Sequence, residues 1–228
     1  MIHTLRRVWN LGSLLLRWMT EGTPEKSSCG QVLLILGGAR THELECARML
    51  KELEDRNSQA AVRSLSPTQL VLLSSGSASL AQVSEASGTK PSRTRLDYRA
   101  VDTLTNFTSI ASDLARSGCT SVTVATSQAH MRRAFPLAVL VLGSHGIRVS
   151  QLACPNSFDR HAKDENTRRV LRDFARALVW VLFGWDGVSV SAIFHPERQR
   201  TAQEASASIT QPSWPSFLAP RPSSVKES

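Results

Sequence analysis

The 228-residue chain lacks most of the features that mark a structural, repetitive or membrane-spanning protein. Its 12 glycines and 10 prolines are too few for a collagen, and no unit of about 20–50 residues repeats, which excludes a solenoid. The longest apolar stretches, residues 134–142 and 177–183, fall far short of the ~20 residues that a membrane-spanning helix needs. The chain is nevertheless long enough for one ordinary domain with a substantial core and short appendages.

Cysteines are few, and they belong to no recognisable metal or disulfide motif. The four are Cys29, Cys46, Cys119 and Cys154, with no CxxC pair and no histidine at zinc-ligand spacing. A small secreted protein held together by disulfides would have a denser set. We therefore expect reduced cysteines in packed positions and no metal site.

Aromatic residues are also scarce, whereas positive charge is in excess. The formal net charge is +8, and residues 90–133 alone carry seven basic and three acidic side chains. The chain has one tyrosine, no alternation of aromatic and basic residues and no helix-turn-helix or zinc-finger motif, which disfavours a nucleic-acid partner. A small anionic ligand is the partner that we expect instead.

The first 20 residues contain Arg6, Arg7 and Arg17, several apolar residues and no acidic one. They lack the long apolar core and the cleavage site of a signal peptide. Three interpretations of residues 1–28 stay open: a helix packed on the domain, a basic amphipathic helix on a membrane surface, and an organelle-targeting segment. A cytoplasmic location and an organellar one, with or without membrane association, are open in the same way.

Short apolar runs alternate with helical patterns through residues 29–195, which we interpret as a single domain. Such alternation is typical of a mostly parallel sheet flanked by helices, so we predict an α/β, Rossmann-like doubly wound fold. Residues 77–92 are rich in serine, alanine and glycine and are predicted to be a loop, and residues 196–228 a disordered tail. The predicted strands are residues 31–36, 69–73, 121–125 and 147–152, and the predicted helices 41–55, 102–117, 127–143 and 166–184.

Ligands of doubly wound folds bind at the carboxyl ends of the strands, so the residues that follow each predicted strand are the candidate site. The spacing of the glycines matches neither GxGxxG nor a Walker loop. Glycines let the backbone approach a ligand, and amides at a helix start attract anions. The candidates are Gly37, Gly38 and Arg40 after the first strand, Ser75 and Gly76 after the second, and Thr126, Ser127, His130 and Arg133 after the third.

His130 and Arg133 are three residues apart and share one face of a helix. The ordinary pKa of histidine lies near neutrality, so His130 is the candidate general acid or base if the site is catalytic. Arg133 and Arg40 suit a carboxylate or phosphate. Asp102 and Thr103 are candidate helix caps that also join the ligand set, and Asn106 adds an amide that can donate and accept.

These motifs come in the order found in the YdcF-like proteins, classed as domain of unknown function 218, which include the bacterial envelope proteins SanA and ElyC. The chain resembles this family over about residues 31–184, most specifically at Asp102-Thr103…Asn106 and Thr126-Ser127…His130…Arg133. The resemblance implies a Rossmann-like fold with a pocket formed by these motifs. It further implies S-adenosylmethionine as a candidate cofactor, because one bacterial member binds it, and envelope-related roles. The chain departs from the family in residues 77–92 and in having no clear transmembrane helix before the domain.

The expectation that follows is a YdcF-like domain that binds a small anionic ligand at the carboxyl ends of its strands. The ligand would carry phosphate or carboxylate and resemble a nucleotide or S-adenosylmethionine, and neither the sequence nor the resemblance decides whether it is turned over. The alternative is a membrane-surface protein that handles a lipid-linked ligand.

Overall fold

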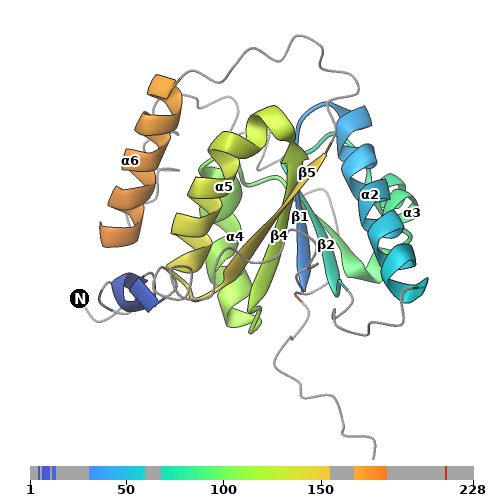
Figure 1. The fold of residues 1–228 in the computed structure, drawn as a ribbon, viewed down its shortest axis with the longest axis horizontal. Helices are drawn as coiled ribbons and strands as arrows, with labels where there is room; N and C mark the ends of the chain where they lie inside the picture. The colour runs from blue at the N-terminus through green and yellow to red at the C-terminus, as the bar shows by residue number, and fades with distance from the viewer. Residues whose placement is uncertain are drawn as a thin grey trace, which may run out of the picture.

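A computed structural model of the chain describes residues 5, 7–10, 12–13, 31–59, 68–154, 167–183 and 214. Within them, five parallel strands form one sheet in the order β3-β2-β1-β4-β5 (Figure 1). This topology confirms the predicted α/β doubly wound fold. The strands are β1 (Val32–Leu36), β2 (Leu70–Ser74), β3 (Thr94–Asp97), β4 (Ser121–Ser127) and β5 (Arg148–Cys154).

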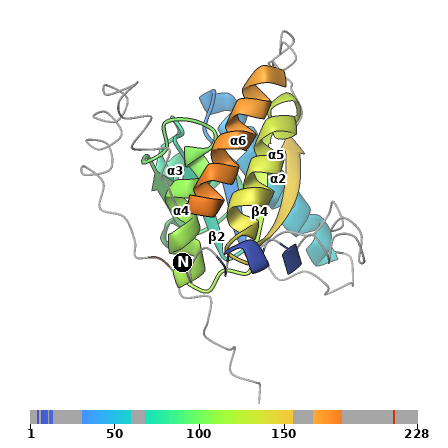
Figure 2. The ribbon, with the colours of Figure 1, turned by 90° about the vertical axis from the view of Figure 1, so that its left-hand side faces the viewer.

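Helices cover both faces of the sheet. One face packs against α2 (Arg40–Gln59) and α3 (Leu80–Ser87), and the other against α4 (Thr105–Arg116) and α5 (Gln128–Gly143). The last described helix, α6 (Thr167–Phe183), packs on α5. Figure 2 shows α6 in front of α5, with no other described helix over it.

The central strand β1 shows why the apolar runs are continuous. Val32, Leu34 and Leu36 face the core beneath α4 and α5, whereas Leu33 and Ile35 face the core beneath α2 and α3. All five side chains are buried, as expected where helices cover both faces of a parallel sheet.

The predicted loop at residues 77–92 is wrong, because this segment contains α3 and a 3-10 turn (Pro91–Arg93). Ser79 and Gln82 form a capping box at the start of α3, and Gly88 ends it in the left-handed conformation. The Ser84 and Ser87 side chains donate to nearby carbonyl oxygens, so they are buried but satisfied. Because residues 77–92 are rich in serine, their sequence does not show the pattern of the short helix that they form.

Two cysteines are joined, which corrects the expectation that all are reduced. Cys46 on α2 and Cys154 at the end of β5 form a disulfide, with Cα atoms 5.7 Å apart and a separation of 108 positions in sequence. Parallel topology brings these distant residues together, and spacing along the chain carries no sign of it. Cys119 is buried and free, and burial raises the pKa of its thiol to about 11. Cys29 lies outside the described residues.

The described parts of the two ends of the chain contact the domain. Near the N-terminus, the Arg7 guanidinium lies 4.5 Å from the centre of the Trp180 ring, and the Asn10 amide donates to the Ser144 carbonyl oxygen at 3.3 Å. In the predicted tail, Trp214 packs against the core and lies under Arg95, whose Cζ is 4.5 Å from the ring centre. The rest of residues 196–228 lies outside the described residues, and no described helix has the length and apolarity to cross a membrane.

Candidate functional site

The crevice that a doubly wound sheet offers a ligand lies where neighbouring strands send their connections to opposite faces. Here β1 and β4 are neighbours, and α2 leaves β1 toward one face while α5 leaves β4 toward the other. The predicted residues Gly37, Gly38 and Arg40 therefore flank the crevice from one side, and Ser127 and His130 from the other.

On the β1 side of the crevice, the backbone amides of Gly37 and Gly38 already donate hydrogen bonds to acceptors of the same chain. The Gly37 N–H donates to the Ser74 carbonyl oxygen at 2.7 Å, and the Gly38 N–H donates to Glu43 Oε1 at 2.8 Å. The fully buried Glu43 carboxylate also accepts from the Ser77 and Ala78 amides, at 3.0 and 2.8 Å. Glu43 thus ties the loop after β1 to the loop after β2, a role that we did not predict from the sequence.

Three predicted site residues on this side, Gly37, Ser75 and Gly76, have structural roles. A Cβ on Gly37 would meet the Ser75 carbonyl oxygen at 2.2 Å, so only glycine fits where the two loops cross. A Cβ on Gly76 would meet the Leu73 side chain at 2.5 Å. Ser75 has a φ of 55°, and its hydroxyl donates to the Ala100 carbonyl oxygen. Arg40, in contrast, is exposed at the start of α2.

The Asp102 segment shapes the start of α4. Asp102 Oδ1 accepts from the Thr105 N–H and hydroxyl, both at 2.8 Å, and Oδ2 lies 2.9 Å from Arg176 Nη1. Burial opposes ionisation of Asp102, but the bonds from Thr105 and the charge of Arg176 outweigh it and hold the pKa below its ordinary value. Asn106 is 7% exposed, and its Oδ1 accepts from the Ser74 hydroxyl at 2.8 Å. Thr103 is buried.

The start of α5 holds the candidate histidine. Ser127 is the N-cap, and its hydroxyl accepts from the His130 N–H at 3.3 Å, while Thr126 is buried in β4. Arg133 Nη2 lies 3.3 Å from His130 Nδ1. A guanidinium only donates, so Nδ1 is the acceptor and a neutral His130 carries its proton on Nε2. In that form the ring presents an N–H donor on the side away from Arg133.

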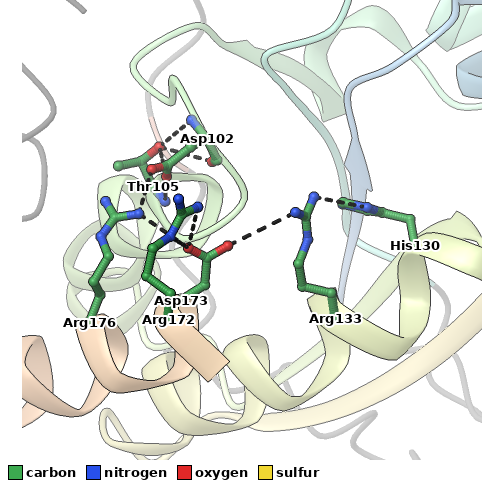
Figure 3. A network of polar contacts seen from close by, with 7 residues as sticks. All are labelled: Asp102, Thr105, His130, Arg133, Arg172, Asp173 and Arg176. Carbon is green, nitrogen blue, oxygen red and sulfur yellow. Dashed lines mark hydrogen bonds and ion pairs between the residues drawn. The ribbon is translucent and has the colours of Figure 1, made fainter. Parts of the chain in front are cut away.

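A polar network connects this histidine to Asp102 (Figure 3). At its centre is Asp173 of α6, which is 4% exposed. Its carboxylate lies 4.0 Å from Arg133 Nη1, 3.0 Å from Arg172 Nη2 and 3.4 Å from Arg176 Nη1. Arg176 Nη1 also contacts Asp102, so the network connects three guanidinium groups with two carboxylates.

The structure therefore brings together three predicted residues that are far apart in sequence: Asp102, His130 and Arg133. Asp173, Arg172 and Arg176, which connect them, were missed. One sequence signal points to Asp173: it is the only acidic residue of α6, a helix that also contains four arginines. Nothing in the described contacts links Arg40 to this network.

An open cavity of about 500 Å³ lies nearby, between α5 and β5. The described residues of its lining include none of the predicted site residues and are Gln128, Met131, Arg132, Phe135, Pro136, Gln151, Leu152 and Ala153. Among the described residues, no group of three or more histidine, cysteine, aspartate or glutamate side chains could hold a metal ion.

The motifs behind the resemblance occupy the carboxyl end of the sheet. The Asp102 stretch begins α4 and the Ser127 stretch begins α5, and the network of α6 connects them. The fold agrees with the Rossmann-like fold that the resemblance implies, whereas none of these motif residues is among the described lining of the cavity between α5 and β5. Comparison with known proteins adds no relative: the chain matches no protein-family model, and no curated protein or solved structure is detectably similar to it.

Proposed function

We propose that this chain binds a small anionic ligand at the carboxyl ends of β1 and β4, on the side of the crevice where α5 begins. The supporting observation is the network around Asp173, which holds the Arg133 guanidinium beside His130 in the first two turns of α5. A preorganised guanidinium and a helix N-terminus at a strand end attract phosphate or carboxylate.

The residues of the site have separate roles in this proposal. Arg133 provides charge, and His130 donates its Nε2 hydrogen to the ligand. Ser127 caps α5 and orients its first turn, and Arg40, exposed at the start of α2, is the second cation offered to the ligand. Asp102 and Asp173 are positioning residues, because they act through the arginines that they contact.

The resemblance to the YdcF-like proteins narrows the ligand class to a nucleotide or an S-adenosylmethionine-like molecule. The engaged amides of the β1 loop favour contact through α5 rather than through Gly37 and Gly38. If the ligand is turned over, His130 is the group placed to give a proton to it or take one from it.

Thermal-shift measurements with AMP, S-adenosylmethionine and inorganic phosphate test this function. A ligand that binds only the folded state raises stability by RT ln(1 + [L]/Kd), so millimolar concentrations reveal even weak binding. Titration calorimetry at two salt concentrations then compares Arg133→Ala and Arg40→Ala with Arg56→Ala. Arg56 is a matched control because its side chain is 76% exposed on α2.

We expect Arg133→Ala and Arg40→Ala to weaken binding by about 2–3 kcal/mol, and Arg56→Ala to have little effect. His130→Asn, which leaves the charge of Arg133 in place, separates loss of turnover from loss of binding. Equal losses in all three arginine variants that fade together with salt would mean diffuse attraction and would refute a defined site. No shift with any of the three probes would also count against it.

A further inference from the structure

The outward side of α6 is apolar, contrary to the usual arrangement of a surface helix. The side that packs on the domain contributes Asp173, Ala177, Trp180 and Val181, all at most 4% exposed. Six large apolar side chains point elsewhere and are exposed: Leu171 (69%), Phe174 (37%), Leu178 (38%), Val179 (41%), Leu182 (43%) and Phe183 (66%). Leu171, Phe174, Leu178 and Leu182 follow one another at helical intervals of three and four residues, so they form a continuous stripe.

The described part of the N-terminal segment adds to this apolar surface. Leu5, Val8 and Trp9 are 64%, 45% and 76% exposed. Arg7, between them, stacks on Trp180 and donates to its carbonyl oxygen at 3.4 Å, which fixes the segment to the C-terminal half of α6. Figures 1 and 2 show it beside that end of α6 from two directions. We call these nine exposed residues of the segment and of α6 the apolar face.

Among the described residues, the exposed charged side chains next to the apolar face are arginines. Arg168 and Arg169 are exposed on α6, and the only acidic residue of that helix, Asp173, is buried. The first 20 residues contain three arginines and no acidic residue. Exposed leucine, phenylalanine and tryptophan flanked by arginine is the pattern of helices that lie at a lipid–water interface.

We propose that the apolar face docks on the surface of a bilayer that contains anionic phospholipid. Its apolar side chains enter the boundary between headgroups and acyl chains, and the arginines pair with lipid phosphates and carboxylates. At 17 residues α6 is about 25 Å long, so it provides a strip that lies along the membrane. Complementary charge is the reason to name a bilayer rather than a second copy of this chain, whose identical arginines would repel. The inference is independent of the proposed anion site, because it uses the opposite side of α6.

Vesicle flotation of the full-length chain tests this inference. The vesicles are phosphatidylcholine alone, or phosphatidylcholine with about 30% phosphatidylserine. One variant removes apolar contact (Leu171→Ser with Leu178→Ser) and one removes charge (Arg168→Gln with Arg169→Gln). Arg48→Gln with Arg56→Gln is the matched control, because both of these arginines are exposed on α2, which covers the other face of the sheet. Thermal melting checks that each variant is folded.

We expect the native chain to partition into the phosphatidylserine vesicles at least about tenfold more than into phosphatidylcholine, and high salt to weaken this binding. Both α6 variants should lose about tenfold or more, and the α2 variant little. Absence of native binding, or equal losses in the α2 and α6 variants, would overturn the inference. Concentration-dependent dimers in light scattering that only the leucine variant abolishes, without vesicle binding, would assign the face to self-association and overturn it as well.

Discussion

Asp173→Asn is the substitution that most directly tests the network around His130. Asparagine has nearly the same shape as aspartate, so the change removes a buried charge and leaves the packing intact. Asp173 is 4% exposed, and three arginines of two helices surround its carboxylate. Removal of one partner from a buried ion pair typically costs about 3–5 kcal/mol, because the remaining charge is uncompensated.

Two features reduce that cost here. The Arg172 side chain is 64% exposed, and Arg176 keeps Asp102 at 2.9 Å, so the loss falls mainly on Arg133, which is 15% exposed. We therefore expect a loss of about 2–3 kcal/mol, which lowers Tm by about 5–10 °C for a chain of this size. The control is Glu52→Gln, which removes an exposed carboxylate beside Arg56 and should cost less than about 0.5 kcal/mol.

Calorimetric melting of both variants measures the difference, and nitrogen NMR of the histidines reports the tautomer of His130. The native ring should carry its proton on Nε2, and Asp173→Asn should allow the Nδ1 form to appear as Arg133 moves. If Asp173→Asn melts within about 1 °C of Glu52→Gln, the carboxylate does not stabilise the arginines and the reasoning about the network is wrong.

Two further predictions concern stability. A reductant should lower the Tm of the native chain, because a disulfide typically contributes about 2–4 kcal/mol, and it should leave the Tm of Cys46→Ser with Cys154→Ser unchanged. Burial, assisted by Arg7, lowers the pKa of His145 despite its contact with the Val141 carbonyl oxygen, so the unfolded chain binds a proton there more readily than the folded one. Stability should then fall as pH falls below about 6.5, and the drop in Tm between about pH 8 and pH 5.5 should be smaller in His145→Gln; an equal drop would contradict this sign.

The sequence predicts those parts of the molecule whose pattern is local. The run of β1 is apolar at every position because both faces of the sheet are covered, and Ser127 can be recognised as a cap from its place between a strand and a helix. The features that it does not predict depend on which distant elements meet. Asp173 acquires its role only because α6 packs on α5, and nothing near Cys46 in the chain indicates that β5 ends beside it.

The glycine candidates illustrate a second limit. The sequence indicates that Gly37 lets the backbone approach a ligand, whereas in the structure it allows a close approach of the neighbouring loop. A glycine that follows a strand has the same sequence signature in both cases. Only the position of the Ser75 carbonyl oxygen separates them.

Glu43 places a carboxylate of the chain itself where many doubly wound proteins hold the phosphates of a nucleotide. The amides that could bind a phosphate at this point therefore already donate to a carboxylate of the same chain. A pyrophosphate at the start of α2 would have to displace that carboxylate, which cannot diffuse away. The same carboxylate holds two loops together, so removing it to free the amides would also loosen the rim of the crevice. Acquisition of a dinucleotide cofactor by a relative of this chain would therefore require compensating changes in both loops at once, which restricts the ligands that this version of the fold can evolve to bind.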